Sequence, residues 1–255
     1  MTKPKVFISH ITEEAVLAEL LKTHIVDDFL GLIEVFVSSD AESISVGDKW
    51  LNDVDKALKE AKIEVILCSD ESVTRPWINF EAGAGWIKGI PVVPVCHTGM
   101  RPVDLPIPLN MLQAIEANDV GGLKRLYARL ANELGAATPK GDFEAIRKVV
   151  LDFEHDYGVV RVISGTVSGL IELLPELEQI FQPNPVHKNA QGDVSDIILD
   201  KMRPHLDLLQ THGMIEYATG SNKIVFGATG GGNRIVLKLR VHEEYYEIAD
   251  KVMGE

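Results

Sequence analysis

The sequence predicts an α/β protein: a first domain built on a parallel sheet with helices on both faces, followed by a smaller α+β domain. Two observations predict this arrangement. Short apolar runs alternate with longer amphipathic ones over the first half of the chain, and this rhythm changes after residue 136. Strands that alternate with helices form βαβ units, with right-handed crossovers and a parallel sheet. The 255 residues are enough for two such domains, each with its own core.

Five strands separated by helices are predicted in the first domain, residues 1–136. The apolar runs that predict the strands lie at 5–9, 33–38, 64–69, 92–96 and 112–117. Their nearly uninterrupted Val, Ile and Phe character is typical of parallel strands that are buried on both faces. Apolar residues at helical spacing predict the intervening helices at 12–30, 48–62, 78–89 and 122–135.

Residues 137–255 predict a second domain with a different order of elements. Helices are expected at 143–158, 194–213 and 242–252, and strands at 214–218, 223–228 and 234–241. The stretch PNPVHKNAQGD (183–193) is predicted as a loop because it carries two prolines. A helix followed by a hairpin has the outline of a winged-helix module. The glycine-rich GATGGGN (227–233) is interpreted as the hairpin turn, because it lacks the Lys-Ser/Thr pair of a phosphate-binding loop and precedes a strand.

The charge of the chain argues against nucleic acid and membranes as partners. With 25 Lys and Arg against 38 Asp and Glu, the net charge is −13, which repels phosphate backbones and anionic lipids. Residues 137–255 carry 12 basic and 18 acidic side chains, so we expect this domain to bind a protein or a small effector. Neither a membrane-spanning apolar run nor the apolar stretch of a signal peptide is found, so a cytoplasmic protein is expected.

The two cysteines are expected to be reduced core residues. Cys68 and Cys96 each end an apolar run, EVILC and VVPVC, and this setting is typical of buried thiols rather than of a disulfide or a metal pair. The neighbouring acids Asp70 and Glu71 have no His or further acid at ligand spacing, so no metal site is predicted.

Candidate functional residues follow the predicted strands, because open parallel sheets bind ligands beyond the carboxyl ends of their strands. Ser9 and His10 follow the first strand, and Ser39 and Asp40 follow the second. These four residues are therefore expected to line a crevice at one edge of the sheet.

Trp77 and Glu81 are four residues apart, so a helix that begins at Trp77 presents both side chains on one face, toward that crevice. An indole can stack on a heterocyclic base, and a carboxylate can stabilise positive charge that develops at an anomeric carbon. The pair fits cleavage of an N-glycosidic bond. Because the nicotinamide of NAD⁺ already carries a positive nitrogen, it leaves without a second acid. This hypothesis requires that the Glu81 carboxylate face an opening and not the protein interior.

These segments together resemble the bacterial Toll/interleukin-1 receptor (TIR) domain. The resemblance rests on KVFISH, SSDAESISVGDKW, EVILCSDESVTRPW and WINFEAGAGW, and it covers residues 3–135. It implies a flavodoxin-like five-stranded parallel sheet and, in the enzymatic branch of the family, cleavage of NAD⁺ to nicotinamide and ADP-ribose or a cyclic form. Glu81 matches the catalytic glutamate, and Trp77 matches the aromatic residue at the nicotinamide end. The segments that contact the nucleotide in the family contain here Ser9, His10, Ser39 and Asp40.

The resemblance also implies how such an enzyme is used. NAD⁺ is the substrate, and no cofactor is expected. The loop with Gly47 and Asp48 matches a loop that packs against a neighbouring protomer in the family, which implies a homo-oligomer held by TIR–TIR contacts. Depletion of NAD⁺ on self-assembly fits a bacterial defence or toxin-type effector.

Simpler interpretations stand beside the enzymatic one. Glu81 could complement the dipole of its helix, Trp77 could pack under a loop, and His10 could be a hydrogen-bonding residue at a strand end. Trp50 and Trp86 are expected in the core. If Glu81 is structural, the protein is a non-enzymatic adaptor that acts through TIR–TIR interaction. A nucleoside-modifying transferase is a third hypothesis, because a carboxylate at a sheet edge can also attack a nucleoside sugar.

Overall fold

A five-stranded parallel sheet forms the centre of the first part of the chain. The computed structural model describes residues 3–38, 56–225 and 232–253. Each neighbouring pair of strands is parallel, and the spatial order β2-β1-β3-β4-β5 is the flavodoxin-like order that was predicted. The strands are β1 (Lys5–Ser9), β2 (Glu34–Ser38), β3 (Ala61–Cys68), β4 (Val92–Cys96) and β5 (Ile115–Glu116).

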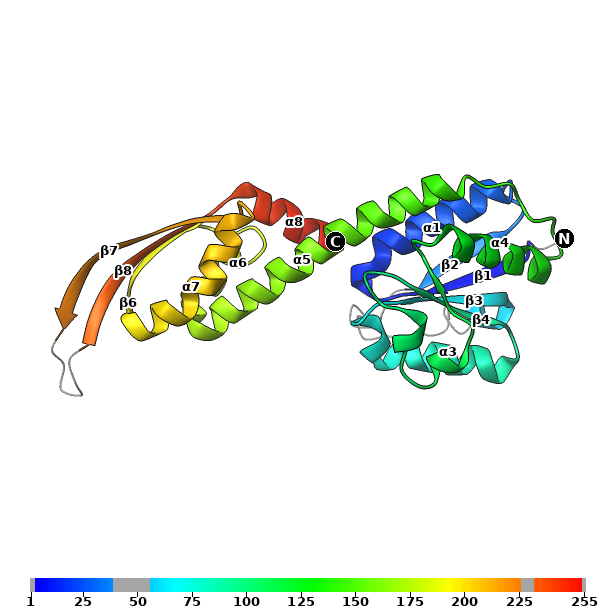
Figure 1. Cartoon of the computed structure of the whole chain (residues 1–255), viewed down its shortest axis with the longest axis horizontal. Coiled ribbons are helices and arrows are strands. Elements are labelled where there is room, and N and C mark those ends of the chain that lie inside the picture. The colour runs from blue at the N-terminus through cyan, green and yellow to red at the C-terminus, as the bar shows by residue number, and fades with distance from the viewer. Residues whose placement is uncertain (1–2, 39–55, 226–231, 254–255) are drawn as a thin grey trace. The chain divides into compact units, whose positions relative to one another are not determined.

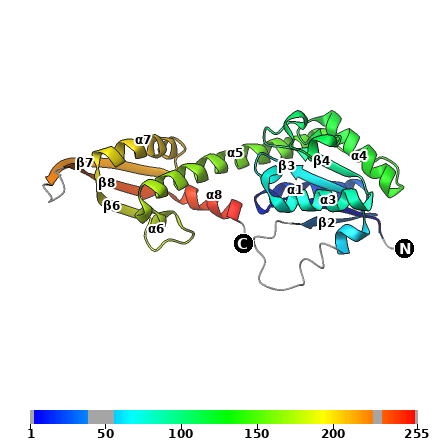
Figure 2. The same ribbon diagram turned by 90° about the horizontal axis from the view of Figure 1, so that it is seen from below.

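Helices cover both faces of this sheet. Helix α3 (Pro76–Lys88) lies on one face, and α1 (Ala15–Asp28) and α4 (Val120–Leu134) lie on the other (Figures 1 and 2). A short 3₁₀ turn, Thr12–Glu14, leads from β1 into α1. The right-handed crossovers between parallel strands require helices on the two sides, so this layering follows from the alternation of strands and helices in the sequence.

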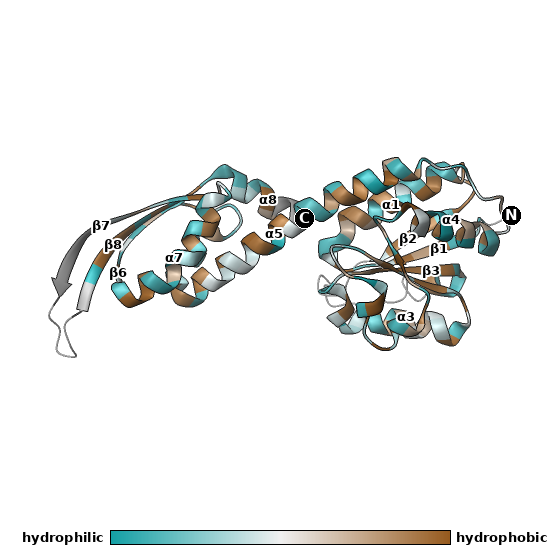
Figure 3. Ribbon diagram, viewed as in Figure 1, coloured by the Kyte–Doolittle hydropathy of each residue, from teal (hydrophilic) through white to brown (hydrophobic). Residues whose placement is uncertain are grey.

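The central strands run through the middle of the core, because they are buried on both faces. Every residue of β3 from Ile63 to Cys68 is fully buried. Figure 3 shows the apolar character of these central strands. Both cysteines, Cys68 and Cys96, are free and buried, which confirms the prediction of reduced core thiols.

Two differences from the predicted boundaries change the sheet. The helix predicted to reach residue 62 ends at 60, and β3 begins at Ala61, because Ala61 and Ile63 are buried beside β1 while Lys62 between them is exposed. Strand β5 is limited to Ile115–Glu116, which pair with the last two residues of β4. The first half of β4 therefore has a strand on one side only.

The chain divides into two compact units, residues 1–156 and 157–255. The division falls inside α5 (Phe143–Leu173), later than the predicted boundary between residues 136 and 137. The first part of α5 belongs to the first unit: the ring of Phe143 lies 5.0 Å from that of Tyr127, and Arg147 Nε donates to the carbonyl of Asn118 at 3.0 Å.

The second part of α5 contributes to the core of the second unit. Ile163, Val167 and Leu170 are buried in this core. Gly169 lies within α5, at a point where His205 of α7 (Asp196–Thr211) comes close to the helix backbone. A Cβ added at Gly169 would lie 2.7 Å from Cε1 of His205. The glycine thus allows two helices of the unit to approach closely.

A three-stranded antiparallel sheet of order β6-β8-β7 completes the second unit. The pairing of β7 with β8 was predicted, but the strands predicted at 214–218 and 223–228 are one strand, β7, with an irregularity between Thr219 and Asn222. Strand β6 lies at the end of the stretch 183–193 that was predicted as a loop. The unit shares a hairpin with winged-helix modules, but α7 is the one helix between β6 and β7, and a helix-turn-helix needs two. The remaining elements are α6 (Glu178–Phe181), β6 (Asn189–Ser195), β7 (Ile215–Val225), β8 (Gly232–Val241) and α8 (Glu243–Met253).

Candidate active site

Two serines end neighbouring strands at the carboxyl edge of the sheet. Ser9 is the last residue of β1, Ser38 is the last residue of β2, and the two are partners in the strand register. One pair earlier on the same face, the rings of Phe7 and Phe36 stack at 5.5 Å. Because side chains alternate along a strand, the serines and the two rings point to the same side of the sheet, toward α3.

The Glu81 carboxylate binds both serine hydroxyls. Ser9 Oγ donates to Oε2 at 2.5 Å, and Ser38 Oγ donates to Oε1 at 2.9 Å. Each carboxylate oxygen is therefore held by a hydroxyl from a different strand. Hydrogen bonds to a carboxylate are about twice as strong as neutral ones, so this pair fixes Glu81 at the position where β1 and β2 end.

Helix α3 presents Trp77 and Glu81 on the same face, as their spacing predicts. Pro76 occupies the first turn, where a missing N–H leaves no hydrogen bond unmade. Trp77 is half-buried and packs against the apolar cluster that contains Phe7 and Phe36, one turn before Glu81. The indole also lies 5.1 Å from the ring of Phe80. Trp77 thus lies at the same end of the sheet as the carboxylate but forms part of the packing between α3 and the strands.

The Glu81 side chain is fully buried. The enzymatic hypothesis requires a Glu81 carboxylate that faces an opening, and this expectation is not met. In the conformation described, a ligand can reach the carboxylate only if neighbouring atoms move. The serine hydroxyls that hold it are buried as well, so the whole cluster of Ser9, Ser38 and Glu81 is closed.

Of the remaining predicted site residues, the structure describes His10. His10 is buried, its Nδ1 lies 2.6 Å from the carbonyl oxygen of Ile11, and burial lowers the pKa of its imidazole. Ser39 and Asp40 lie outside the described residues, as do Gly47, Asp48 and Trp50. Ser38, which the prediction passed over in favour of Ser39, contacts the carboxylate. Its position opposite Ser9 in the strand register is the signal that identifies it.

A second buried carboxylate at the same edge was not anticipated. Glu14 Oε1 accepts hydrogen bonds from Ser69 Oγ at 2.6 Å and from His97 Nε2 at 3.1 Å, and Oε2 accepts from the backbone N–H of Ile11 at 3.3 Å. Ser69 follows β3 and His97 follows β4, so this glutamate connects the ends of two strands to the turn before α1.

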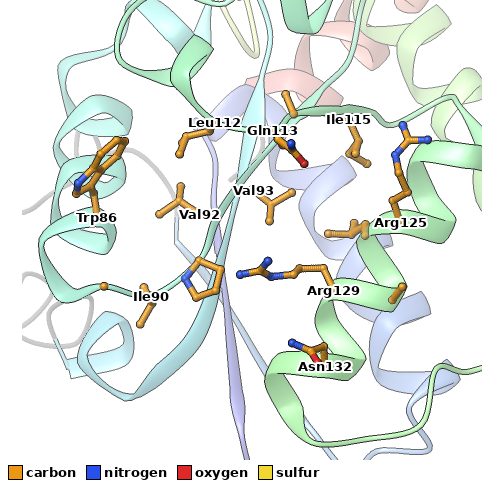
Figure 4. A pocket seen from close by; sticks show the side chains of 15 residues that line it. Trp86, Ile90, Val92, Val93, Leu112, Gln113, Ile115, Arg125, Arg129 and Asn132 are labelled. Atoms are coloured by element: carbon orange, nitrogen blue, oxygen red, sulfur yellow. The ribbon is translucent and has the colours of Figure 1, made fainter.

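A cavity of about 840 Å³ lies elsewhere in the first unit (Figure 4). None of the described residues that were predicted for the site lines it. Trp86 is on one wall and Arg125 and Arg129 from α4 are on the other, with Val92 and Val93 of β4 between them. Trp86 is 53% exposed, so the prediction that it lies in the core is wrong. It projects beside β4, where the short β5 leaves the sheet edge without a neighbouring strand.

The described residues also bear on membranes and metals. Among the helices in the described ranges, none combines the length and the apolar character that crossing a membrane requires. Over the same residues, no group of three or more His, Cys, Asp and Glu side chains has the arrangement of a metal site.

Comparison with known families assigns the first part of the chain. A family model described as TIR domain matches residues 6–130, which contain the parallel sheet, except for Lys5 of β1, and the Glu81 cluster. The match does not extend into residues 131–255. No curated protein matches the sequence.

Proposed function

Because residues 6–130 of this chain are a TIR domain, we propose that the protein cleaves NAD⁺ at the bond between nicotinamide and ribose, with Glu81 as the catalytic carboxylate. The observation that carries the proposal is the position of this carboxylate, fixed by two hydroxyls at the carboxyl ends of β1 and β2. Ligands of open parallel sheets bind at that edge.

The chemistry requires one negative group near the sugar. When the glycosidic bond breaks, its electron pair moves to the ring nitrogen, nicotinamide leaves as a neutral molecule, and the ribose carbon becomes positively charged. A fixed carboxylate stabilises that charge more than it stabilises neutral ground-state atoms. Capture by water, which then loses a proton, gives ADP-ribose, and capture by a nucleophile within the same molecule gives a cyclic form.

The remaining side chains have supporting roles in this proposal. Ser9 and Ser38 orient the carboxylate, and Trp77 provides an aromatic surface at the nicotinamide end. His10, Ser39 and Asp40 remain proposed contacts to the nucleotide. NAD⁺ enters as the substrate, so the reaction needs no further cofactor.

The burial of Glu81 makes activity conditional. We propose that the closed cluster opens when TIR domains self-associate, so that NAD⁺ cleavage depends on assembly. An enzyme that is closed as a single chain would not deplete cellular NAD⁺ until triggered, which suits a defence or toxin-type effector in the cytoplasm. Residues 157–255 are proposed to bind the protein or small effector that starts assembly.

The experiment is incubation of the full chain with NAD⁺ over a wide range of protein concentration, with nicotinamide release measured by chromatography. Specific activity is expected to rise with protein concentration and to disappear in Glu81→Gln. Glu116→Gln, which changes an acid at the end of β5 on the same sheet edge, is the matched control. Absence of nicotinamide release at every concentration, with a crowding agent included, would refute the proposal.

One observation favours a different function. Full burial and hydrogen bonds to two strands are also typical of a structural residue. If Glu81 is structural, the protein is an adaptor that acts through TIR–TIR contacts. An adaptor with Glu81→Gln keeps its self-association and its partner binding. The enzyme with the same change keeps self-association and loses nicotinamide release, so the two measurements together separate the functions.

A further inference from the structure

A third glutamate, Glu64, lies inside the sheet next to Glu81. It occupies the middle of β3, between Phe7 of β1 and Val92 of β4, and it is fully buried. Its carboxyl group lies against the backbone of α3: a Cβ added at Gly85 would be 1.9 Å from Oε2 of Glu64. Gly85 follows Glu81 by one helical turn, so both glutamates lie under the same face of α3.

The Glu64 carboxyl group has no hydrogen-bond partner within residues 3–38, 56–225 and 232–253. Neither oxygen of this fully buried side chain receives a donor there. This contrasts with Glu81, whose oxygens each accept a serine hydroxyl. An ionised carboxylate buried without donors is far less stable than a neutral carboxyl group, because nothing replaces the water that solvates the charge.

The surrounding charges act in the same direction. Burial, and next the negative charge of Glu81, raise the pKa of Glu64 well above its usual value. The positive charge of Lys88, on α3, opposes this increase in the pKa. The strand neighbours on either side, Phe7 and Val92, carry no charge. Two acids therefore share one buried region, and only one of them has donors for a negative charge.

We propose that Glu64 is a positioning residue for Glu81: it keeps its proton at neutral pH, so that the single negative charge under α3 is carried by the carboxylate that the serines hold. In alkaline solution Glu64 releases its proton to solvent and becomes a second anion. Two adjacent anions repel each other, and Glu81 then leaves the two serine hydroxyls or takes up a proton itself. Either change removes the fixed carboxylate on which the proposed NAD⁺ cleavage rests.

The first test is the pH dependence of nicotinamide release, which presupposes the proposed activity. Wild type is expected to lose activity at alkaline pH. Above the pH at which Glu64 ionises, the rate should fall tenfold for each further pH unit. Glu64→Gln, with a neutral side chain of the same shape, is expected to keep a flat alkaline limb. Glu116→Gln is the control and should retain the wild-type profile. An unchanged alkaline limb in Glu64→Gln, or a large loss of activity at pH 7 in a folded variant, would overturn the inference.

The second test does not depend on enzymatic activity. In the unfolded chain Glu64 ionises near its ordinary value of about 4.3, whereas the folded chain retains the proton, so rising pH favours unfolding of wild type. The ratio of the unfolding constants of wild type and Glu64→Gln should increase tenfold per pH unit above that value, until Glu64 ionises in the native state. Urea titrations at pH 5, 6, 7 and 8 measure this ratio.

The two tests separate failure of the inference from failure of the proposed function. Suppose that neither wild type nor any variant cleaves NAD⁺, but the ratio of unfolding constants rises with pH. Glu64 is then the neutral acid of the pair, and only the proposed enzymatic function is refuted. If the ratio does not change with pH, Glu64 is ionised in the folded protein and the inference is wrong, whatever the activity. Repeating the titration in a Glu81→Gln background should shorten the pH range of the rise, because the charge that opposes ionisation of Glu64 is gone.

Discussion

Glu14 and Glu81 are both fully buried at the carboxyl edge of the same sheet, yet their surroundings differ in kind. Glu14 accepts hydrogen bonds from a backbone N–H, an imidazole and a hydroxyl, and these donors come from three different elements. Glu81 accepts from two serine hydroxyls on adjacent strands. A backbone donor cannot turn away without moving the chain, and a buried imidazole needs space to rotate, whereas a hydroxyl rotates about one bond.

Both acids are buried, so we expect the kind of donor, and not burial, to separate a structural acid from a functional one. Glu14 joins parts of the chain that fold together, and loss of its carboxylate would leave several buried donors without an acceptor. If the cluster opens, the serine hydroxyls can rotate with a small movement of the Glu81 carboxylate and keep it oriented toward the substrate. We therefore expect changes at Glu14 to reduce stability and changes at Glu81 to reduce activity.

The largest expected effect is on activity. Glu81→Gln should lower the rate of nicotinamide release by about 10³-fold, or about 4 kcal/mol in the activation free energy, because the charge that stabilises the sugar cation is lost. The thermal unfolding midpoint should change little, since the serine hydroxyls can donate to the amide oxygen or accept from the amide nitrogen. Chromatography of the products and calorimetry on the same sample provide the two readings. Wild-type turnover in this variant would remove Glu81 from the site.

The next effect is on stability. Glu14→Ala should lower the free energy of unfolding by about 3 kcal/mol, because buried donors of Ser69, His97 and Ile11 lose their acceptor. Urea titration measures it. The control is Glu13→Ala, whose partly exposed pair with Arg75 should contribute at most about 1 kcal/mol. Equal losses in the two variants would show that the Glu14 network is not a structural centre, and the comparison with Glu81 would fail.

The parallel strands and the position of Glu81 on its helix could be predicted from the sequence, because each depends on residues that are close together in the chain. Strands β1 and β4 begin and end where the predicted runs do, since a strand buried on both faces is largely apolar. Strand β6 was missed because it is a largely exposed edge strand, in which only Val194 is buried. The spacing of Trp77 and Glu81 placed both on one helix face.

The settings of Glu14 and Glu64 could not be predicted, because they depend on residues that are distant in sequence. Glu64 stands within the apolar run EVILC, and its burial depends on the space left by Gly85 on the helix that crosses over β3. Glu14 depends on His97, which is 83 residues later. The closure of the Glu81 cluster is likewise a property of the packed domain and not of any local pattern.

A third variant extends the comparison to Glu64. Gly85→Ala should destabilise the protein by about 2 kcal/mol, because the new methyl group overlaps the Glu64 carboxyl group and a methyl of Val92. Gly83→Ala is a matched control two residues earlier in α3. Its Cβ would meet nothing within 4 Å, so this change should stabilise the helix by about 0.5–1 kcal/mol.

A second-site change tests the cause of that loss. Adding Glu64→Ala to Gly85→Ala should restore part of the lost stability, since the shorter side chain frees the space under α3. Thermal unfolding of the two single variants and the double variant completes a mutant cycle. Strictly additive losses would mean that Gly85 and Glu64 are not in contact, and the position of the third acid under the helix would then be wrong.

The smallest expected effects concern the serine hydroxyls. Ser9→Ala and Ser38→Ala should each lower the rate of nicotinamide release by about tenfold, equivalent to about 1.4 kcal/mol. Each removes one of the two donors that orient Glu81, but the carboxylate keeps its charge. Ser69→Ala is the matched change on the other network, where the hydroxyl donates to Glu14, and it should lower stability without slowing turnover.

The pattern across these three serines decides between the two kinds of buried acid more directly than either glutamate variant does. Each change removes one buried serine hydroxyl that donates to a buried glutamate at the same sheet edge, so burial and size are matched. Ser69 Oγ also accepts from the backbone N–H of Ser72 and bonds the Ser72 hydroxyl, so a larger loss of stability is expected for Ser69→Ala. If donors to Glu81 serve catalysis, the first two variants slow the reaction more than they weaken the fold, and Ser69→Ala does the reverse. If all three weaken the fold equally and leave the rate unchanged, Glu81 is as structural as Glu14, and the adaptor function follows.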